Sequence, residues 1–376
     1  TPISALLHAA TMVTAGVYIV AIFHFLYSGI EEIGLFIAYV GAISALLAAV
    51  IATKQTDIKK ILAYSTMSQL GYMFIAVGLG FYSTGLFHVF THAFFKAMLF
   101  MGAGGIIIAL HHEQNIFKIA KHRANLPIIG LTFLIGVIAI SGIPPFSGFF
   151  SKDAILAAAF QEGQYLIYGI ALFTAFLTAY YMFRMYFIVF VAPNHHDVDY
   201  VYTSKTITLP LLILAIGAVG AGFLNLPSIF GGNHFVDTWL GQLNSKVIHL
   251  DHSTEYILMI LSVVVAACGI FVAYKKYANF DLSKEETETG FVGRKLYVDE
   301  LYDFLFVKSA KAISTFIDKV LDDKIIDAFI MKSSISFVNV GKKVAMIQNA
   351  NVRFYAVFML IGMTCIFVYL YITLGL

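Results

Sequence analysis

The segment HVFTHAFFKAML, residues 88–99, places three proton-binding side chains at steps of four in an otherwise apolar run. On an α-helix His88, His92 and Lys96 share one stripe, and each follows the last after about one turn, roughly 6 Å. A lysine near the centre of a bilayer costs at least ~2.5 kcal/mol, so one that persists there usually faces an interior cavity. The spacing therefore predicts a line of groups that bind and pass protons.

Two other interpretations of this stripe stay open. Each side chain could be a buried polar group that neighbouring helices satisfy. His88 and His92 could instead ligate a haem or a metal ion. One helix supplies at most two adjacent ligands, and no Cys, Asp or Glu cluster lies near them in the sequence, which disfavours a metal site.

A second candidate site lies in SGIPPFSGFFSKD, residues 141–153. Pro144 and Pro145 lack backbone donors, so an apolar helix should be discontinuous there. If a half-helix begins near Gly148, its positive dipole end favours Asp153 and disfavours a charged Lys152. A lysine that gains and releases a proton suits a transfer site, whereas an interfacial Lys–Asp cap is the structural alternative.

Several other polar residues lie in apolar runs. His8 stands among small and hydroxyl residues and alone would be more typical of a satisfied core histidine. Arg184 is expected to be an internal countercharge or a residue that snorkels to the membrane surface. Ser65 and Thr66 give their helix an unusually polar face, which suits contacts between helices or the wall of a water file.

The composition requires a membrane protein. Of the 376 residues 60% are hydrophobic and 12% are charged, and the mean hydropathy is +0.84. The net charge of +2 is too small to indicate a nucleic-acid partner. Cys268 and Cys365 lie far apart, and there is no glycine-rich nucleotide loop, so we expect this chain to bind no metal, iron–sulfur cluster or nucleotide cofactor.

We predict an all-α polytopic membrane protein with about nine transmembrane helices, since roughly 20 apolar residues cross the hydrocarbon. One of the nine, Leu126 to Phe160, is interrupted at Pro144-Pro145. The other predicted spans are Ile3 to Tyr27, Gly34 to Thr53, Ile58 to Gly80, Thr84 to Leu110, Tyr165 to Val191, Ile207 to Leu226, Tyr256 to Tyr277 and Phe354 to Leu374.

Basic residues gather on one side of this topology, which we assign to the cytoplasm or its organellar equivalent. That side receives Lys54, Lys59, Lys60, Lys118, Lys121, Arg123, Lys205, Lys275 and Lys276. Between the last two spans, residues 293–350 are too charged to cross. Leu301, Leu305, Ala312, Phe316 and Val320 fall near one helical face there, which predicts a long amphipathic helix along the membrane or along partner subunits.

Four motifs together resemble the proton-pumping, antiporter-like subunits of respiratory complex I, NADH:quinone oxidoreductase. They are TPISALLHAATMVTAGVY, DIKKILAYSTMSQLGYM, HVFTHAFFKAMLFMGAGG and SGIPPFSGFFSKD. The segment LYVDELYDFLF, followed by an amphipathic stretch and one last span, is similar to the distal member of that family, in which a lateral helix runs along neighbouring subunits.

The resemblance implies a proton relay through His8, His92, His88, Lys96 and Lys152, supported by Asp153. It also implies that flavin, iron–sulfur clusters and quinone belong to partner subunits. The partners are then the other membrane-arm subunits, reached through the lateral helix, and the lipid bilayer. The expected location is the bacterial inner membrane, with the mitochondrial inner membrane as the alternative.

The resemblance further implies a division of the chain. Residues 1–33 are expected to end a first half whose remainder lies upstream, with a glutamate–lysine pair. Residues 34–191 form a five-helix proton-channel unit, 192–292 two additional helices, 293–350 the lateral helix and 351–376 a C-terminal anchor. Alternative functions are a subunit of an Mrp-type cation/proton antiporter, a subunit of a membrane-bound hydrogenase complex, or a purely structural membrane-arm subunit.

Overall fold

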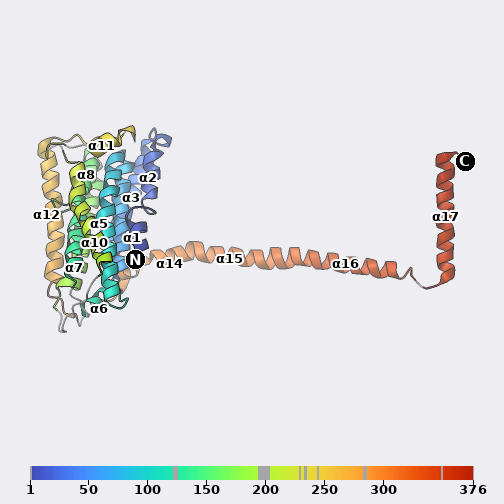
Figure 1. Cartoon of the computed structure of the whole chain (residues 1–376). Coiled ribbons are helices and arrows are strands. Elements are labelled where there is room, and N and C mark those ends of the chain that lie inside the picture. The colour runs from blue at the N-terminus through green and yellow to red at the C-terminus, as the bar shows by residue number, and fades with distance from the viewer. Residues whose placement is uncertain are drawn as a thin grey trace. The chain divides into compact units, whose positions relative to one another are not determined.

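The computed structural model describes residues 2–121, 126–193, 204–227, 230–232, 235–243, 245–282, 286–348 and 350–375. Within these residues the regular structure is helical, apart from isolated bridge residues such as the pair Asp57 and Asn115. The chain divides into two compact units, Thr1–Leu296 and Tyr297–Leu376. The first unit is a bundle whose long helices stand side by side (Figure 1).

Seven helices in the described residues are long and apolar enough to cross a membrane. This confirms the prediction of an all-α polytopic membrane protein. The seven are α3 (Glu31–Ala52), α4 (Ile58–Gly78), α5 (Tyr82–Ala109), α9 (Tyr165–Tyr186) with a π-helical continuation to Val191, α10 (Lys205–Gly220) with a 3-10 turn to Leu224, α12 (His252–Tyr277) and α17 (Val352–Leu374). Short helices lie between them, namely α6 (Ile116–Lys121), α11 (Phe235–Trp239) and α13 (Gly290–Gly293).

Polar caps fix where several spans begin. Asp57 accepts hydrogen bonds from the backbone amides of Lys59, at 2.8 Å, and Lys60, at 3.1 Å, at the start of α4. Asp251 accepts from the amide of Thr254 at the start of α12. Such caps satisfy amides that have no partner within the helix. Arg123, one of the predicted cytoplasmic basic residues, lies outside the described residues.

The predicted break in the fifth span is present. It separates α7 (Pro127–Ser141) from α8 (Ser147–Gln161), and the Pro144-Pro145 bond in the connection is cis. Gly142 ends α7 with φ +77°, a left-handed conformation that favours glycine. α8 then packs back against α7, where a Cβ on Gly148 would collide with the carbonyl oxygen of Ala139.

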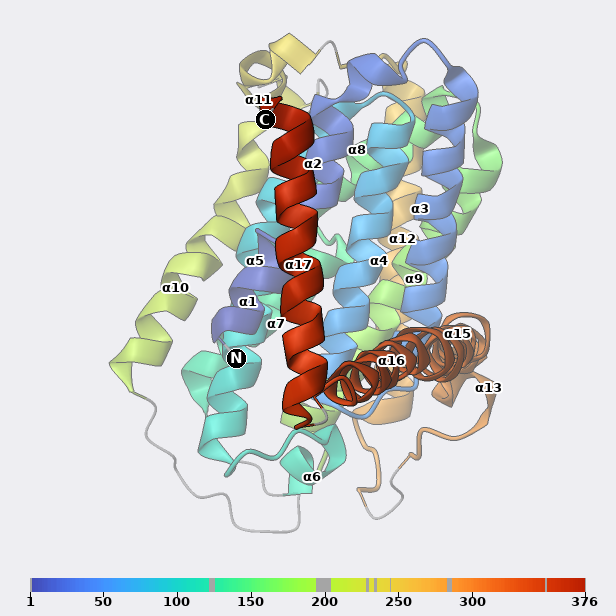
Figure 2. The ribbon, with the colours of Figure 1, turned by 90° about the vertical axis from the view of Figure 1, so that its right-hand side faces the viewer.

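The first predicted span is also discontinuous, which the sequence interpretation did not anticipate. α1 (Pro2–Ala9) and α2 (Ala15–Ile22) are separate helices, seen one above the other in Figure 2. In the connection, Thr11 and Thr14 donate side-chain hydrogen bonds to the carbonyls of Leu6 and Ala10. These side-chain contacts replace part of the regular backbone ladder, as hydroxyl residues do in membrane helices.

Helix α5 is the centre of the first unit. It contacts α1, α4, α7, α8 and α10, and most of its side chains are buried. Beside it, α3 and α4 make the most extensive helix pair. Gly41 and Gly71 face each other there, and a side chain on either would collide with the backbone of the other.

The second unit begins with a long helix, as the sequence predicts. It comprises α14 (Val298–Tyr302), α15 (Lys308–Phe316) and α16 (Ala328–Ala345), joined by π-helical stretches at Asp303–Val307 and Ile317–Asp327. A π-helix winds more loosely than an α-helix. The face predicted from uniform α-helical spacing therefore shifts along the helix at each π-helical stretch.

We expect Gly148→Ala to destabilise the chain by about 1–3 kcal/mol, because the added methyl group would push α8 away from α7. Gly169→Ala is the matched control, since a Cβ on this α9 glycine meets nothing within 4 Å. Thermal unfolding of both purified variants in detergent would measure the difference. Equal midpoints for the two variants would contradict the close approach of the half-helices.

Candidate functional site

The predicted stripe on α5 is entirely buried. His88 is 1% exposed, and Thr91, His92 and Lys96 are each 0% exposed. In the described residues no group of three or more metal-ligating side chains surrounds them. The partner of His92 is instead a backbone carbonyl, and the partners of His88 are a side-chain amide and a hydroxyl. Each histidine therefore has a neighbour that limits which nitrogen holds a proton.

His92 binds to the break in the first span. Its Nδ1 lies 2.9 Å from the carbonyl oxygen of Ala9, the last residue of α1. A carbonyl only accepts, so Nδ1 carries a hydrogen and donates it. The discontinuity between α1 and α2 thus orients His92, and its Nε2 is buried with no hydrogen-bond partner in the described residues.

His88 links three helices through side chains. Its Nε2 lies 3.1 Å from Oε1 of Gln69 on α4, and its Nδ1 lies 2.9 Å from Oγ of Ser151 on α8. The same Ser151 hydroxyl lies 2.8 Å from Oγ1 of Thr91. A hydroxyl can donate and accept, so Ser151 can adjust to either protonation state of His88.

Lys96 lies deep in the bundle, away from any acidic partner that the structure describes. Its Nζ has no hydrogen bond or ion pair in the described residues, and it lies 6.0 Å from the centre of the Phe100 ring. The ring of His8 stacks on the same Phe100, with 5.3 Å between the centroids. Phe100 therefore places His8 of α1 close to Lys96, although no direct hydrogen bond joins them.

Lys152 and Asp153 diverge on α8. Lys152 is 3% exposed, and its Nζ lies 5.1 Å from the centre of the Tyr72 ring with no hydrogen-bond partner in the described part of the chain. Asp153 accepts a hydrogen bond of 2.6 Å from Oγ of Ser262 on α12. Tyr72 is itself held by a 2.5 Å bond to the carbonyl of Ala171.

The polar residues of α4 make different kinds of contact. Ser65 accepts a hydrogen bond from the hydroxyl of Tyr181 at 2.9 Å, which joins α4 to α9. Thr66 instead bonds back to the carbonyl of Leu62 in its own helix. Oγ of Ser68 and Nε2 of Gln69 have no partner in the described residues.

Arg184 is a buried countercharge in the last turn of α9. It is 0% exposed, and it donates to the carbonyl of Gln55 at 2.8 Å and to the Glu286 carboxylate at 3.1 Å. Lys276 and Tyr277 also donate to Glu286. Burial by itself raises the pKa of Glu286, but Arg184 first, with Lys276 and Tyr277, more than offsets this and holds the pKa below its ordinary value of 4.5.

Sequence reasoning located most of the charged groups but missed four partners. Gln69 lies within the motif DIKKILAYSTMSQLGYM but is not singled out by the sequence, and neither are Ser151, Ser262 and Glu286. Ser151 directly precedes Lys152 in SGFFSKD, which was a usable signal. Ser262 lies 109 residues from Asp153 in the sequence, and Glu286 lies 102 residues from Arg184. No local sequence pattern therefore joins either pair.

Several buried polar atoms of the first unit lack a protein partner among the described residues. Buried polar atoms are nearly always hydrogen-bonded to protein or water, so these atoms mark places suited to water. The six that lie on α4, α5 and α8 are Ser68 Oγ, Gln69 Nε2, His92 Nε2, Lys96 Nζ, Ser147 Oγ and Lys152 Nζ.

Comparisons with known proteins agree on one group of relatives. The family described as NADH:quinone oxidoreductase/Mrp antiporter, transmembrane, matches residues 1–178. NADH-quinone oxidoreductase subunit L of Escherichia coli is 38% identical over 96% of this chain and 58% of its own length. NAD(P)H-quinone oxidoreductase subunit 5 of the Paulinella chromatophora chromatophore is 37% identical over 98% of this chain and 60% of its own length.

A solved structure has a similar fold. It is a chain of the membrane-bound sulfane sulfur reductase, an archaeal respiratory membrane complex, with a TM-score of 0.54 and 26% identity over 71% of this chain and 50% of that one. This chain spans at most 60% of the length of the curated relatives named above. The family match contains the candidate residues from His8 to Asp153 but not Arg184.

We expect Glu286→Gln to lower the stability of the chain by about 2 kcal/mol near pH 7, because it leaves the buried Arg184 without a carboxylate. The Glu286 pKa is depressed in the folded state, so its contribution is present above about 4.5 and is lost as pH falls through the folded value. Thermal unfolding in detergent at several pH values measures both effects.

The control for this prediction is Asp303→Asn, which removes an exposed pair with Lys308 at 3.9 Å and should change stability by less than ~1 kcal/mol. If the difference in unfolding midpoint between wild type and Glu286→Gln stays constant from neutral to strongly acid pH, the assigned ion pair is contradicted.

Proposed function

Because this chain belongs to the NADH:quinone oxidoreductase/Mrp antiporter family of membrane subunits, we propose that it conducts protons across the membrane within an NADH:quinone oxidoreductase. One observation supports this most directly. Three buried nitrogen atoms on adjoining helices, His92 Nε2, Lys96 Nζ and Lys152 Nζ, have no hydrogen-bond partner in the described residues. Such atoms have room to accept or release a proton.

Protons enter from the side that carries the basic loops and reach the α5 stripe. His92 keeps its Nδ1 hydrogen on the Ala9 carbonyl, so Nε2 is the nitrogen that takes up a proton. Lys96 lies one turn further along α5. His8, which shares the Phe100 ring with Lys96, belongs to the same group of exchanging residues.

The transfer from α5 to α8 uses His88 and Ser151. When His88 is doubly protonated, both of its nitrogens donate, and the Ser151 hydroxyl must accept from Nδ1. When His88 is neutral, the hydroxyl can donate to Nδ1. This exchange of hydrogen-bond direction next to Lys152 couples the stripe to the broken helix.

Charge on one lysine alters the energy of charge on the next, since Coulomb interactions are strong in the low-dielectric interior. Neither Lys96 nor Lys152 has an ion-pair partner within 4 Å in the described residues that would fix its charge. Signals from neighbouring subunits can therefore drive transfer between them by moving a charge or a helix.

The redox chemistry belongs to partner subunits in this proposal. Flavin, iron–sulfur clusters and quinone are held there, and the present chain holds no redox site. Curated relatives are named as subunits of NADH- or NAD(P)H-quinone oxidoreductases. We place the chain in the bacterial inner membrane, with the long helix of the second unit as the contact to the other membrane-arm subunits.

We expect Lys96→Ala and Lys152→Ala each to reduce proton pumping by about tenfold or more, as loss of an acid–base group does. Pumping would be measured with coupled quinone reduction, on the assembled complex in inverted membrane vesicles. The control is Lys275→Ala, an exposed lysine at the end of α12. Normal pumping by both assembled variants would contradict the proposed relay and favour a purely structural subunit.

The same preparation separates the redox complex from its main rival. Flavin and iron–sulfur centres that co-purify with the chain support the oxidoreductase. A stable assembly without redox centres, with sodium-dependent proton flux, would instead support an Mrp-type antiporter.

The contact through the long helix has its own test. Phe316→Glu places a charge on an exposed apolar position of α15 and should lower recovery of this chain with the other membrane-arm subunits by several-fold. Lys311→Glu, on the same helix, is the control and should leave recovery near the wild-type level. Equal recovery of both variants would contradict the proposed contact.

A further inference from the structure

Three cavities of the first unit follow one another from Lys152 toward the face opposite the basic loops. The first, here the lysine void, has a volume of about 10 Å³ and is lined by Lys152, Asp153 and Ser262 among others. The second, the outer pocket, has about 60 Å³ and is lined by Asp153, Glu255 and Lys246. The third, the outer basin, has about 590 Å³.

Shared residues connect these cavities. Asp153 lines both the lysine void and the outer pocket, and Lys246 lines both the outer pocket and the outer basin. A buried water needs ~10–15 Å³, so the outer pocket has room for more than one water, and the lysine void is near the limit for one. A chain of groups and waters therefore fits between Lys152 and the outer basin.

Asp153 is oriented for transfer between two cavities. Ser262 donates to its Oδ1 at 2.6 Å, so Oδ2 is the oxygen that can exchange a proton. Asp153 is 8% exposed. Its neighbour in sequence, Lys152, also lines the lysine void, and the Lys152 amine has no hydrogen-bond partner in the described residues.

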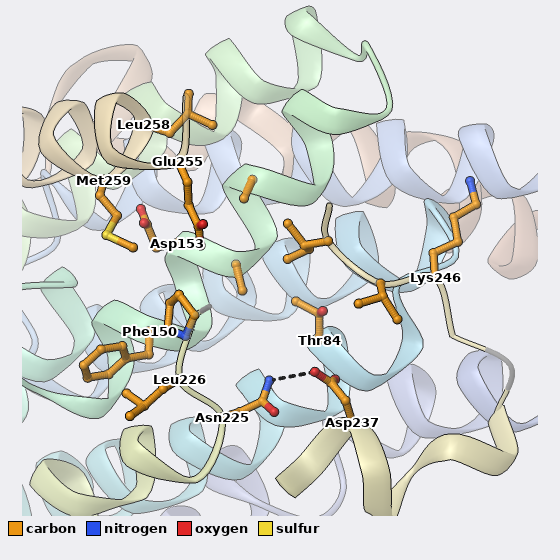
Figure 3. A pocket seen from close by; sticks show the side chains of 15 residues that line it. Thr84, Phe150, Asp153, Asn225, Leu226, Asp237, Lys246, Glu255, Leu258 and Met259 are labelled. Atoms are coloured by element: carbon orange, nitrogen blue, oxygen red, sulfur yellow. Dashed lines mark hydrogen bonds between the residues drawn. The ribbon is translucent and has the colours of Figure 1, made fainter. Parts of the chain in front are cut away.

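Glu255 is the other buried carboxyl group of the outer pocket. It lies in the first turn of α12 and is 9% exposed. Seven residues separate it from Ser262, two turns of helix, so both face α8. Figure 3 shows Glu255 reaching from α12 toward Asp153, and both carboxyl groups line the outer pocket.

Two further charged groups line the outer pocket. Asp237 is held by the side-chain amide of Asn225 at 3.3 Å (Figure 3). Lys246 donates its backbone amide to the carbonyl of Gly80 and its ammonium group to Glu162 at 2.6 Å. Lys246 thus lies where the outer pocket meets the outer basin, and its partner Glu162 lines the basin together with Glu31 and Glu32.

We propose that Glu255 is a proton-release residue, which receives protons from Asp153 in the outer pocket and passes them to the outer basin beside the Lys246–Glu162 pair. This inference rests on the proposed function. In each step an N–H or O–H bond of the donor breaks and an O–H bond of the acceptor forms. Lys152, protonated from the α5 stripe, gives a proton to Asp153, Asp153 gives it to Glu255, and Glu255 gives it to water, so the lysine returns to its neutral form and both carboxyl groups return to the carboxylate.

The test compares Glu255→Gln and Glu255→Asp in the assembled complex in inverted vesicles. We expect Glu255→Gln to lower proton pumping about tenfold, because an amide cannot carry the proton. Glu255→Asp, which keeps the carboxyl group, should retain most of the pumping. Tyr256→Phe is a control for local disturbance, since this neighbouring side chain on α12 is exposed.

Each result separates this inference from the proposed function. Normal pumping by Glu255→Gln, together with loss in Lys152→Ala, overturns the release role and leaves the relay intact. Normal pumping by both Glu255→Gln and Lys152→Ala would contradict the proposed relay as well. Equal loss in the Gln and Asp variants, with assembly preserved, assigns Glu255 a structural role and overturns the proposal.

Discussion

Backbone groups in a membrane must find hydrogen-bond partners within the protein, and the arrangement of this site follows from that constraint. Continuous helices satisfy most of this constraint internally, although carbonyls such as those of Leu62 and Ala171 accept one further bond from a side chain. The two interrupted spans offer additional backbone groups at their helix ends. The end of α1 offers the Ala9 carbonyl to His92, and the break between α7 and α8 sets Ser151 and Lys152 near the stripe of α5. Both breaks lie where buried ionisable groups gather.

The sequence predicts most of this fold because membrane spans carry a strong signal. Apolar runs gave the helices to within a few residues, and Pro144 with Pro145 gave the break before α8. The break between α1 and α2 contains no proline, and its hydroxyl residues are compatible with a continuous helix as well. The π-helical stretches of the second unit leave no mark in a pattern based on 3.6 residues per turn.

The sequence predicts the charged residues of the candidate site but not the hydrogen-bond partners that connect them. A lysine or histidine in an apolar run stands out because burial of charge is costly. Gln69, Ser262 and Glu286 are ordinary residue types whose roles depend on distant helices coming together. Glu255 is near a helix start, where a carboxylate is common, so its place in the outer pocket appears only once α8 and α12 are packed.

Tyr72 gives the molecule an internal optical probe. Its hydroxyl is tied to the Ala171 carbonyl, so the ring is held still while Lys152 lies above it. A positive charge over an aromatic face changes the distribution of the ring's electrons. The ultraviolet absorption and ring vibrations of Tyr72, one of the 21 tyrosines of the chain, therefore differ between the charged and neutral forms of Lys152.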